Sequence, residues 1–363
     1  MPFLSHIHTF QAPFEYHQNE LLAKFLSVPV LKAKERLYRK AFESSCISYR
    51  RSVLPDFAEH YGSKILYTSN EIPPIQDRNN VFKLESLAIL RQLCQQALSA
   101  SNLASDEVTH VITFTCTGLF APGLEIKMLK ELGLTSHVKR YAINFLGCYS
   151  GILAMRLAHE LASLHPNAKI LVFGIELCTL HFNPNEDKDY ILGNTLFADG
   201  AVAFLMQSEK PNVPVCFESE QFTSYLEPNS ESEMAWDLHQ DSLLLRLSSY
   251  VPRILKSGVP ALAYSMQQVG REVAAIDYWA IHPGGISILE AMQTGFGIEK
   301  DQLQSSYHVL DWYGNMSSVT ILYVLNNLIL NGLQNDKNIF CAAFGPGLSI
   351  ETAFLKTHVS SSI

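Results

Sequence analysis

Residues 143–161, INFLGCYSGILAMRLAHEL, join an apolar run typical of a buried strand to a run with helical spacing, and the joint is Gly147-Cys148. A cysteine at such a joint is a small core residue, half of a redox pair, a metal ligand or a nucleophile. The N-terminus of a helix carries about half a unit of positive charge, which favours a thiolate there. The rest of the chain decides among these four explanations.

The composition is that of an ordinary globular protein. Of the 363 residues, 47% are hydrophobic and 17% are charged, so the chain can bury a large core. Its length predicts two core-forming units. The net charge of −8 gives no reason to expect nucleic acid or an anionic membrane as a partner. The sequence has no long apolar run and no signal-peptide pattern, so we expect a cytoplasmic protein that does not span a membrane.

The cysteines argue against two of the four explanations. There are seven of them, they are scattered, and no two form a C-x-x-C pair. This pattern is not that of a disulfide framework or a zinc knuckle, so we expect no metal site. Most of the seven should be core residues, because free cysteine is among the most buried residue types.

Strand-like and helix-like segments alternate in the first half of the chain. Residues 108–116, 140–146 and 169–176 are rich in β-formers, and the segments 123–134 and 148–164 between them have helical spacing. Strands that alternate with helices of ten or more residues predict βαβ units and largely parallel, buried sheets.

The second half repeats this order. We expect a strand at 277–285, a helix at 286–297, a strand at 308–314, a helix after Gly314-Asn315, and a closing strand at 338–345. Cys148 and Asn315 are 167 residues apart, and Thr115 and His282 have the same separation. Self-similarity at so long a period indicates a duplicated domain.

We therefore expect two similar α/β halves, residues 1–208 with the cysteine and residues 209–363 with the histidine and asparagine. If they pack face to face, equivalent joints meet, and Cys148, His282 and Asn315 converge. A cysteine with an adjacent imidazole and an amide is suited to acyl transfer, because the imidazole can pair with the thiolate. The cysteine at the joint is then a nucleophile.

Four motifs resemble one known family. The dipeptide GC at the head of a helix, IHPGG (281–285), YGNMSS (313–318) and FGPGLSIETAFL (344–355) are together similar to the type III polyketide synthases, the chalcone synthase-like branch of the thiolase superfamily. The resemblance covers roughly residue 80 to the C-terminus. It implies an α/β thiolase fold, with duplicated βαβ halves in a five-layer α-β-α-β-α arrangement, and a homodimer.

The resemblance also implies a reaction. Malonyl-CoA would be condensed with loss of CO₂ onto an acyl-CoA starter, repeatedly, and the chain would cyclise to a pyrone, resorcinol or related aromatic product. No carrier protein and no cofactor beyond CoA thioesters would be required. Carried over by position, Cys148 would hold the growing chain as a thioester. His282 would stabilise the thiolate and, with Asn315, form an oxyanion hole, in which one donor is typically worth about 3–4 kcal/mol.

Further positions match the family's cavity. Phe197 matches a gatekeeper phenylalanine, Leu245 stands where a second is expected, and His181 replaces a small residue. The smaller Leu245 favours an extended aliphatic starter over a flat aromatic one. Cys116 stands where the tetrahydroxynaphthalene synthases also have cysteine. A malonyl starter, as in those enzymes, is therefore an alternative to the aliphatic starter. The remaining cavity positions are Thr117, Ala121, Ser317, Gly345, Pro346 and Gly347.

A basic cluster is the candidate for holding the CoA phosphates. Arg39, Lys40, Arg50 and Arg51 form the densest group of cations in this acidic chain, and family members bind CoA through Lys and Arg in this region. A solvated helical face explains the same cluster equally well.

Two other classes of protein compete with this interpretation. An initiating ketoacyl-ACP synthase shares the fold and the Cys-His-Asn set, but usually has Gln-Ala-Asn after its histidine and lacks proline in its C-terminal motif. A thiolase-like partner subunit without activity would have lost its cysteine. The HPGG and GPGLSIE segments argue against the first class, and Cys148 argues against the second.

Overall fold

Nine strands form one sheet in the order β11-β12-β13-β8-β1-β7-β6-β4-β5. The computed structural model describes residues 1–68, 72–185, 187–231, 234–238, 243–246 and 258–360. In the first half β4, β5 and β6 are parallel and β7 is antiparallel; in the second half β11 and β12 are parallel and β13 is antiparallel. The strands are β1 (Phe3–Thr9), β4 (His110–Thr115), β5 (Lys139–Asn144), β6 (Lys169–Leu177), β7 (Asp199–Gln207), β8 (Val215–Leu226), β11 (Tyr278–Ile281), β12 (Asn338–Gly345) and β13 (Ser349–Val359).

Two helices lie between the two halves of this sheet, α6 (Ser150–Leu164) and α12 (Thr320–Leu330). Ile152 of α6 and Ile321 of α12 belong to one buried cluster with residues from both sets of strands. The segment TILYVLNNLIL of α12 is apolar around most of its circumference, as expected for a helix with sheets on both sides. The two central helices are therefore equivalent elements of a repeated fold.

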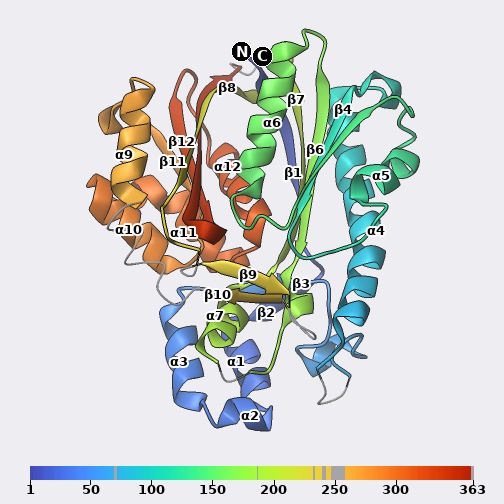
Figure 1. The fold of residues 1–363 in the computed structure, drawn as a ribbon, viewed down its shortest axis with the longest axis vertical. Coiled ribbons are helices and arrows are strands. Elements are labelled where there is room, and N and C mark those ends of the chain that lie inside the picture. Colours follow the sequence, from blue (N-terminus) through green and yellow to red (C-terminus); the bar gives the residue numbers. More distant parts are fainter. Residues whose placement is uncertain (69–71, 186, 232–233, 239–242, 247–257, 361–363) are drawn as a thin grey trace.

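Helices also cover the two outer faces (Figure 1). On the first half these are α4 (Ile75–Ser101) and α5 (Leu124–Leu132). On the second half they are α9 (Val259–Gln268), α10 (Ile286–Phe296) and α11 (Gln304–Tyr313). Each outer layer packs over its own buried cluster. The expected five-layer α-β-α-β-α arrangement is confirmed, and β1 and β8 join its two sheets into one.

One expected strand is wrong. Residues 308–314 were assigned to a strand from a short apolar run, but residues 304–313 form α11. Val309 and Leu310 are adjacent and both buried, and they face different core clusters, which a helix between two layers permits. A short apolar run does not by itself separate a strand from a buried helix. The second half consequently lacks a counterpart of β5 in the described residues.

The remaining elements cover one end of the layers, at the bottom of Figure 1. They include two antiparallel two-stranded sheets and several helices. These elements are β2 (Phe14–His17) with β3 (Tyr49–Ser52), β9 (Ala235–Leu238) with β10 (Leu243–Arg246), α1 (Gln18–Leu26), α2 (Pro29–Lys32), α3 (Glu35–Ser44) and α7 (Lys188–Leu196).

Several expectations from composition can be compared with this structure. The seven cysteines are free thiols, and all except Cys46 are buried, as expected. Within the described residues, no helix is long and apolar enough to cross a membrane. Among these described residues, no group of three or more His, Cys, Asp or Glu side chains is arranged so that it could hold a metal ion.

Candidate active site

Cys148 lies at the joint between β5 and α6. Its side chain is buried, and Sγ lies 3.7 Å from the hydroxyl of Ser317. Burial raises the pKa of the Cys148 thiol to about 12; the Ser317 hydroxyl opposes this rise, and the charge of Glu176 adds to it. The isolated site therefore holds a thiol rather than the thiolate expected from the helix N-terminus, so ionisation requires a group that accepts the proton.

Asn315 occupies the equivalent joint in the second half, and both its backbone and its side chain are hydrogen-bonded. Its backbone N–H donates to Leu196 O, and its carbonyl accepts from Ala198 N, both at 2.9 Å. The side-chain Nδ2 donates to Gly284 O at 3.1 Å, and Oδ1 accepts from Ser317 N at 2.8 Å. These contacts fix the orientation of the amide and leave one N–H of Nδ2 for a ligand.

His282 follows β11 and is completely buried. Neither ring nitrogen has a hydrogen-bond partner among the described residues. Burial lowers the pKa of His282 to about 3, so the imidazole is neutral near pH 7. A methyl group added at Gly284 would lie 3.7 Å from Nε2, and the Gly284 carbonyl accepts the Asn315 amide. Gly284 therefore lies next to both His282 and Asn315.

A small cavity of about 230 Å³, including its open mouth, adjoins the thiol; we call it the nucleophile cavity. It brings together Cys148 and four predicted cavity residues from distant parts of the chain. Its lining is Cys116, Gly147, Cys148, Phe197, Met234, Trp236, Ser317 and Pro346. Phe197 also forms a backbone bridge with Asn315, which connects this cavity to the second-half joint.

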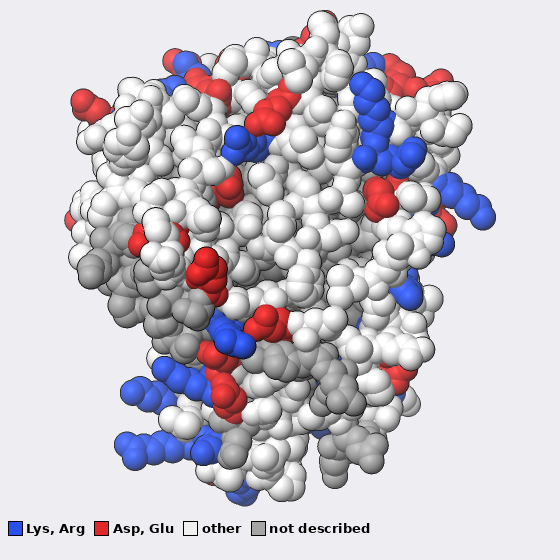
Figure 2. Space-filling view, in the orientation of Figure 1, with Lys and Arg blue, Asp and Glu red and all other residues white. Residues whose placement is uncertain are grey.

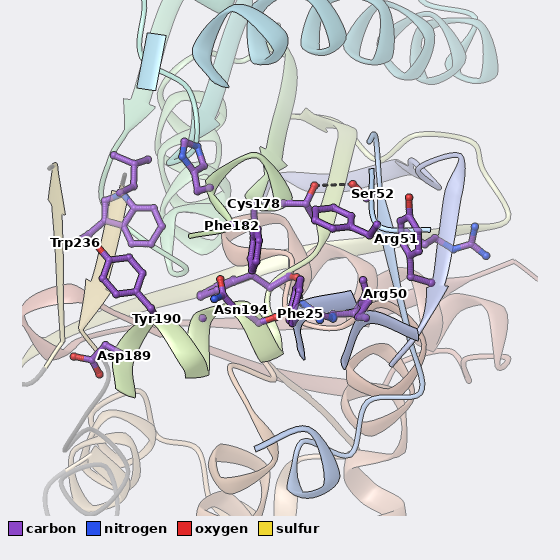
Figure 3. A pocket seen from close by; sticks show the side chains of 18 residues that line it. Phe25, Arg50, Arg51, Ser52, Cys178, Phe182, Asp189, Tyr190, Asn194 and Trp236 are labelled. Atoms are coloured by element: carbon purple, nitrogen blue, oxygen red, sulfur yellow. Dashed lines mark hydrogen bonds between the residues drawn. The ribbon is translucent and has the colours of Figure 1, made fainter. Parts of the chain in front are cut away.

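A larger cavity, of about 690 Å³ including its open mouth, lies beyond Phe197 and Trp236, which line both cavities. Figure 3 shows Trp236 and Tyr190 on one side of it and Arg50 and Arg51 on the other. Its wall is mostly aromatic and aliphatic. The residues used below are Phe25, Arg50, Arg51, His181, Phe197 and Trp236.

Neither space has Thr117, Ala121, Gly345 or Gly347 in its lining, although the family resemblance implies that they are cavity residues. The Thr117 carbonyl contacts the His181 ring. Gly345 and Gly347 flank Pro346, and Ala121 is exposed on the loop after β4. The final residue, Leu245, is in β10 opposite Trp236, but its side chain lies outside the described part of the structure. The expectation about the starter that depended on Leu245 therefore stays a prediction.

Glu176 was not predicted from the sequence. Its fully buried carboxylate accepts hydrogen bonds from Cys116 N at 3.0 Å, from Thr117 Oγ1 at 2.7 Å and from the Ser318 hydroxyl. It thus connects the loops that the two halves place beside Cys148. The feature of the sequence that could have indicated Glu176 is its place inside the apolar strand KILVFGIEL, because a buried charge needs several hydrogen-bond partners.

The four residues of the basic cluster separate into two groups. Arg50 is buried and donates to Gln18 Oε1 and to two backbone carbonyls, and Arg51 pairs with Glu15. Arg39 and Lys40, in contrast, are exposed on α3, where Arg39 pairs with Glu35. Figure 2 shows blue side chains projecting at the lower left, over this part of the molecule.

Comparisons with known proteins agree with the resemblance. The model of the N-terminal domain of chalcone and stilbene synthases matches residues 18–210, and the model of their C-terminal domain matches residues 219–359. "Alpha-pyrone synthesis polyketide synthase-like Pks18" of Mycobacterium tuberculosis is 29% identical over 88% of this chain and 81% of its own length. "Probable polyketide synthase 1" of Dictyostelium discoideum is 31% identical over 88% of this chain, which spans only 10% of that longer protein.

Solved structures show the same fold. The C-terminal type III polyketide synthase domain of Steely1 from Dictyostelium has a TM-score of 0.88 at 28% identity, covering 98% of this chain and 99% of that one. The 1,3,6,8-tetrahydroxynaphthalene synthase of Streptomyces coelicolor has a TM-score of 0.87 at 25% identity, covering 99% and 100%. These matches confirm the expected α/β fold class and the resemblance drawn from the motifs.

Proposed function

Because the chain belongs to the chalcone and stilbene synthase family of type III polyketide synthases, we propose that it condenses malonyl-CoA repeatedly onto an acyl-CoA starter and cyclises the product. The observation that carries this proposal is the arrangement of Cys148, His282 and Asn315. Cys148 contacts Ser317, Ser317 binds the Asn315 amide, and Asn315 binds the glycine beside His282. In the division that we propose, Cys148 belongs to the first half (1–208), and His282 and Asn315 belong to the second half (209–363).

Loading of the starter uses the thiol and the imidazole. The sulfur of Cys148 attacks the thioester carbonyl of acyl-CoA, a new C–S bond forms, and CoA leaves as its thiol. Since burial holds the pKa of Cys148 near 12, the proton has to move as the sulfur attacks. Neutral His282, whose ring nitrogens have no described partner, is the acceptor we assign to this proton.

Extension uses the amide. When malonyl-CoA loses CO₂, negative charge develops on its thioester oxygen. The remaining N–H of Asn315 Nδ2 and the N–H of neutral His282 donate to that oxygen. The carbanion equivalent then attacks the acyl group on Cys148, the C–S bond breaks, and the longer chain returns to the same thiol for the next cycle.

The substrates and setting follow from the same proposal. CoA thioesters are the only small molecules needed, without metal, other cofactor or carrier protein, in a cytoplasmic homodimer. Among the four basic residues, the exposed Arg39 and Lys40 are better candidates for the CoA phosphates than Arg50 and Arg51, whose guanidinium groups already bind protein atoms. A pyrone is a product class supported by the name of the Mycobacterium relative.

One experiment tests this function. Purified protein is incubated with malonyl-CoA and a panel of acyl-CoA starters, without carrier protein; CoA release is measured and products are identified by mass spectrometry. We expect two or more extensions per starter, and none in Cys148→Ala. A single extension, or a requirement for carrier protein, would favour the ketoacyl-ACP synthase alternative.

A further inference from the structure

His181 lies at the end of the 3₁₀ turn Cys178–His181 (η3), directly after β6, and lines the larger cavity. Its ring Nε2 is 2.8 Å from the backbone oxygen of Thr117. A carbonyl oxygen only accepts hydrogen bonds, so in the neutral ring Nε2 carries the proton. Nδ1 is then left with a free lone pair and can act only as an acceptor.

The surroundings keep this ring neutral. Burial lowers the pKa of His181 to about 4; the Thr117 carbonyl opposes this, and the charge of Arg78 lowers it further. Arg78 is fully buried and donates to the carbonyls of Leu180 and Phe182, at 2.6 and 2.8 Å, on either side of His181. His181 lines the larger cavity and is absent from the lining of the nucleophile cavity, so its neutral ring offers a hydrogen-bond acceptor to a ligand rather than a base to Cys148.

Polar atoms without partners distinguish this cavity from a purely apolar one. His181 Nδ1 is buried and has no hydrogen-bond partner among the described residues. Three donors from residues that line the same cavity also lack a described partner: Arg50 Nη2, Arg51 Nε and Trp236 Nε1. Buried polar groups are normally hydrogen-bonded, and an alkyl chain would leave all four unpaired. A ligand with carbonyl oxygens and an O–H group would pair with both kinds of atom.

We propose that Nδ1 of His181 binds an enol hydroxyl of the polyketide chain attached to Cys148 and so determines which ring the chain closes. The proposal rests on the function proposed above. A chain of alternating carbonyl and methylene groups enolises readily, which supplies carbonyl acceptors and an O–H donor together. Phe197 and Trp236 line both cavities, so a chain that grows from Cys148 past these two side chains reaches His181.

Two substitutions separate the acceptor from the rest of the ring. In His181→Gln the amide N–H replaces Nε2 and keeps the bond to the Thr117 carbonyl, but the acceptor at Nδ1 is lost. In His181→Asn the amide oxygen lies near the position of Nδ1, and the bond to Thr117 is lost instead. Phe25→Leu is the matched control, because it enlarges the same cavity without changing a polar group.

Products and CoA release are measured for all three variants with the wild type's best starter. We expect His181→Gln to change the ratio of ring products by about tenfold, with CoA release within about threefold of wild type. His181→Asn and Phe25→Leu should keep the ratio within about threefold. An unchanged ratio in His181→Gln overturns the proposal, as does a larger change in His181→Asn than in His181→Gln.

A loss of CoA release in folded His181→Gln also overturns it, because the residue would then act before ring closure. If His181→Gln does not fold, His181→Asn decides alone: a tenfold change in its ratio overturns the proposal, and an unchanged ratio supports it. Failure of the proposed function itself would be seen separately, as a wild type that does not extend any starter more than once.

Discussion

The joints Gly147-Cys148 and Gly314-Asn315 occupy equivalent places in the two halves and use the same backbone device. Both glycines have positive φ, 101° and 69°, and each precedes a helix of the central layer. The side chains that follow are held very differently. Asn315 makes four hydrogen bonds through its backbone and amide, whereas the Cys148 thiol has one long contact of 3.7 Å with Ser317.

Under the proposed function, this difference corresponds to two roles, an oxyanion donor at Asn315 and a nucleophile at Cys148. An oxyanion donor stabilises charge best when it is oriented beforehand, so a rigid amide is an advantage. A nucleophile has to form and break bonds and carry chains of changing length, so strong hydrogen bonds to its sulfur would oppose the reaction. A duplicated framework has thus placed a fixed group at one joint and a free group at the other.

The largest effect is expected at the free joint. Cys148→Ala should abolish product formation, because the thiol that we propose holds the chain as a thioester is lost. The fold should remain, since the lost side chain is small and the cost in unfolding free energy should be near 1 kcal/mol. Product analysis checks the loss of activity, and thermal unfolding checks that the fold remains. Full-length product from the variant would show that Cys148 is not the nucleophile.

At the fixed joint the expected effect is smaller and confined to one step. Asn315→Ala should slow decarboxylation of malonyl-CoA by about 10²–10³, while the starter still loads onto Cys148. His282→Ala should impair both steps, because the imidazole takes part in both. Loading is followed by mass spectrometry of the intact protein and decarboxylation by CO₂ release. Equal loss of loading in the two variants would contradict this division of roles.

The positive-φ backbone conformation at the two joints can be disturbed by substituting either glycine. A Cβ at Gly147 would lie 2.2 Å from Pro346 Cδ, and one at Gly314 would lie 2.9 Å from Leu196 O. Since each also has a left-handed φ, Gly147→Ala and Gly314→Ala should each lower the unfolding free energy by about 2–4 kcal/mol. Gly133→Ala, at positive φ but in open space, is the control and should cost about 1 kcal/mol. Urea unfolding measures all three; equal losses would show that the contacts add nothing.

The smallest effect is a dependence of stability on pH. The folded protein lowers the pKa of His282 from 6.5 to about 3, so between these values the unfolded chain binds more protons and stability falls as pH falls. From pH 7 to pH 5 this histidine should account for a loss of about 2 kcal/mol. His282→Gln should show a correspondingly smaller loss in urea unfolding at the two pH values. An identical loss would mean that His282 is not neutral in the folded state.

Much of the fold and the core of the site could be predicted without coordinates. The 167-residue separation of Cys148 from Asn315 and of Thr115 from His282 is a property of the sequence, and it indicated two equivalent halves whose joints meet. Cys148, Asn315 and His282 could be recognised in the sequence because each stands next to a glycine or proline that ends a regular segment, and each is a residue type used in catalysis. The α/β class follows from the alternation of strands and helices, which is local information, whereas the five-layer order was implied by the family resemblance.

Only the tertiary structure decided the rest, because burial depends on contacts between distant segments. The segment 304–313 is a helix since its apolar residues pack between two layers. Arg50, a candidate for the CoA phosphates from sequence alone, is buried and donates to Gln18 and to two carbonyls, of residues 194 and 197. The hydrogen bonds of Glu176 and His181 are made with Cys116 and Thr117, about 60 residues earlier in the chain, so the environment of these two side chains cannot be predicted from local sequence. The sequence by itself determined which groups are available for the chemistry, and the packing of the two halves determined which are charged, which are held and which remain free.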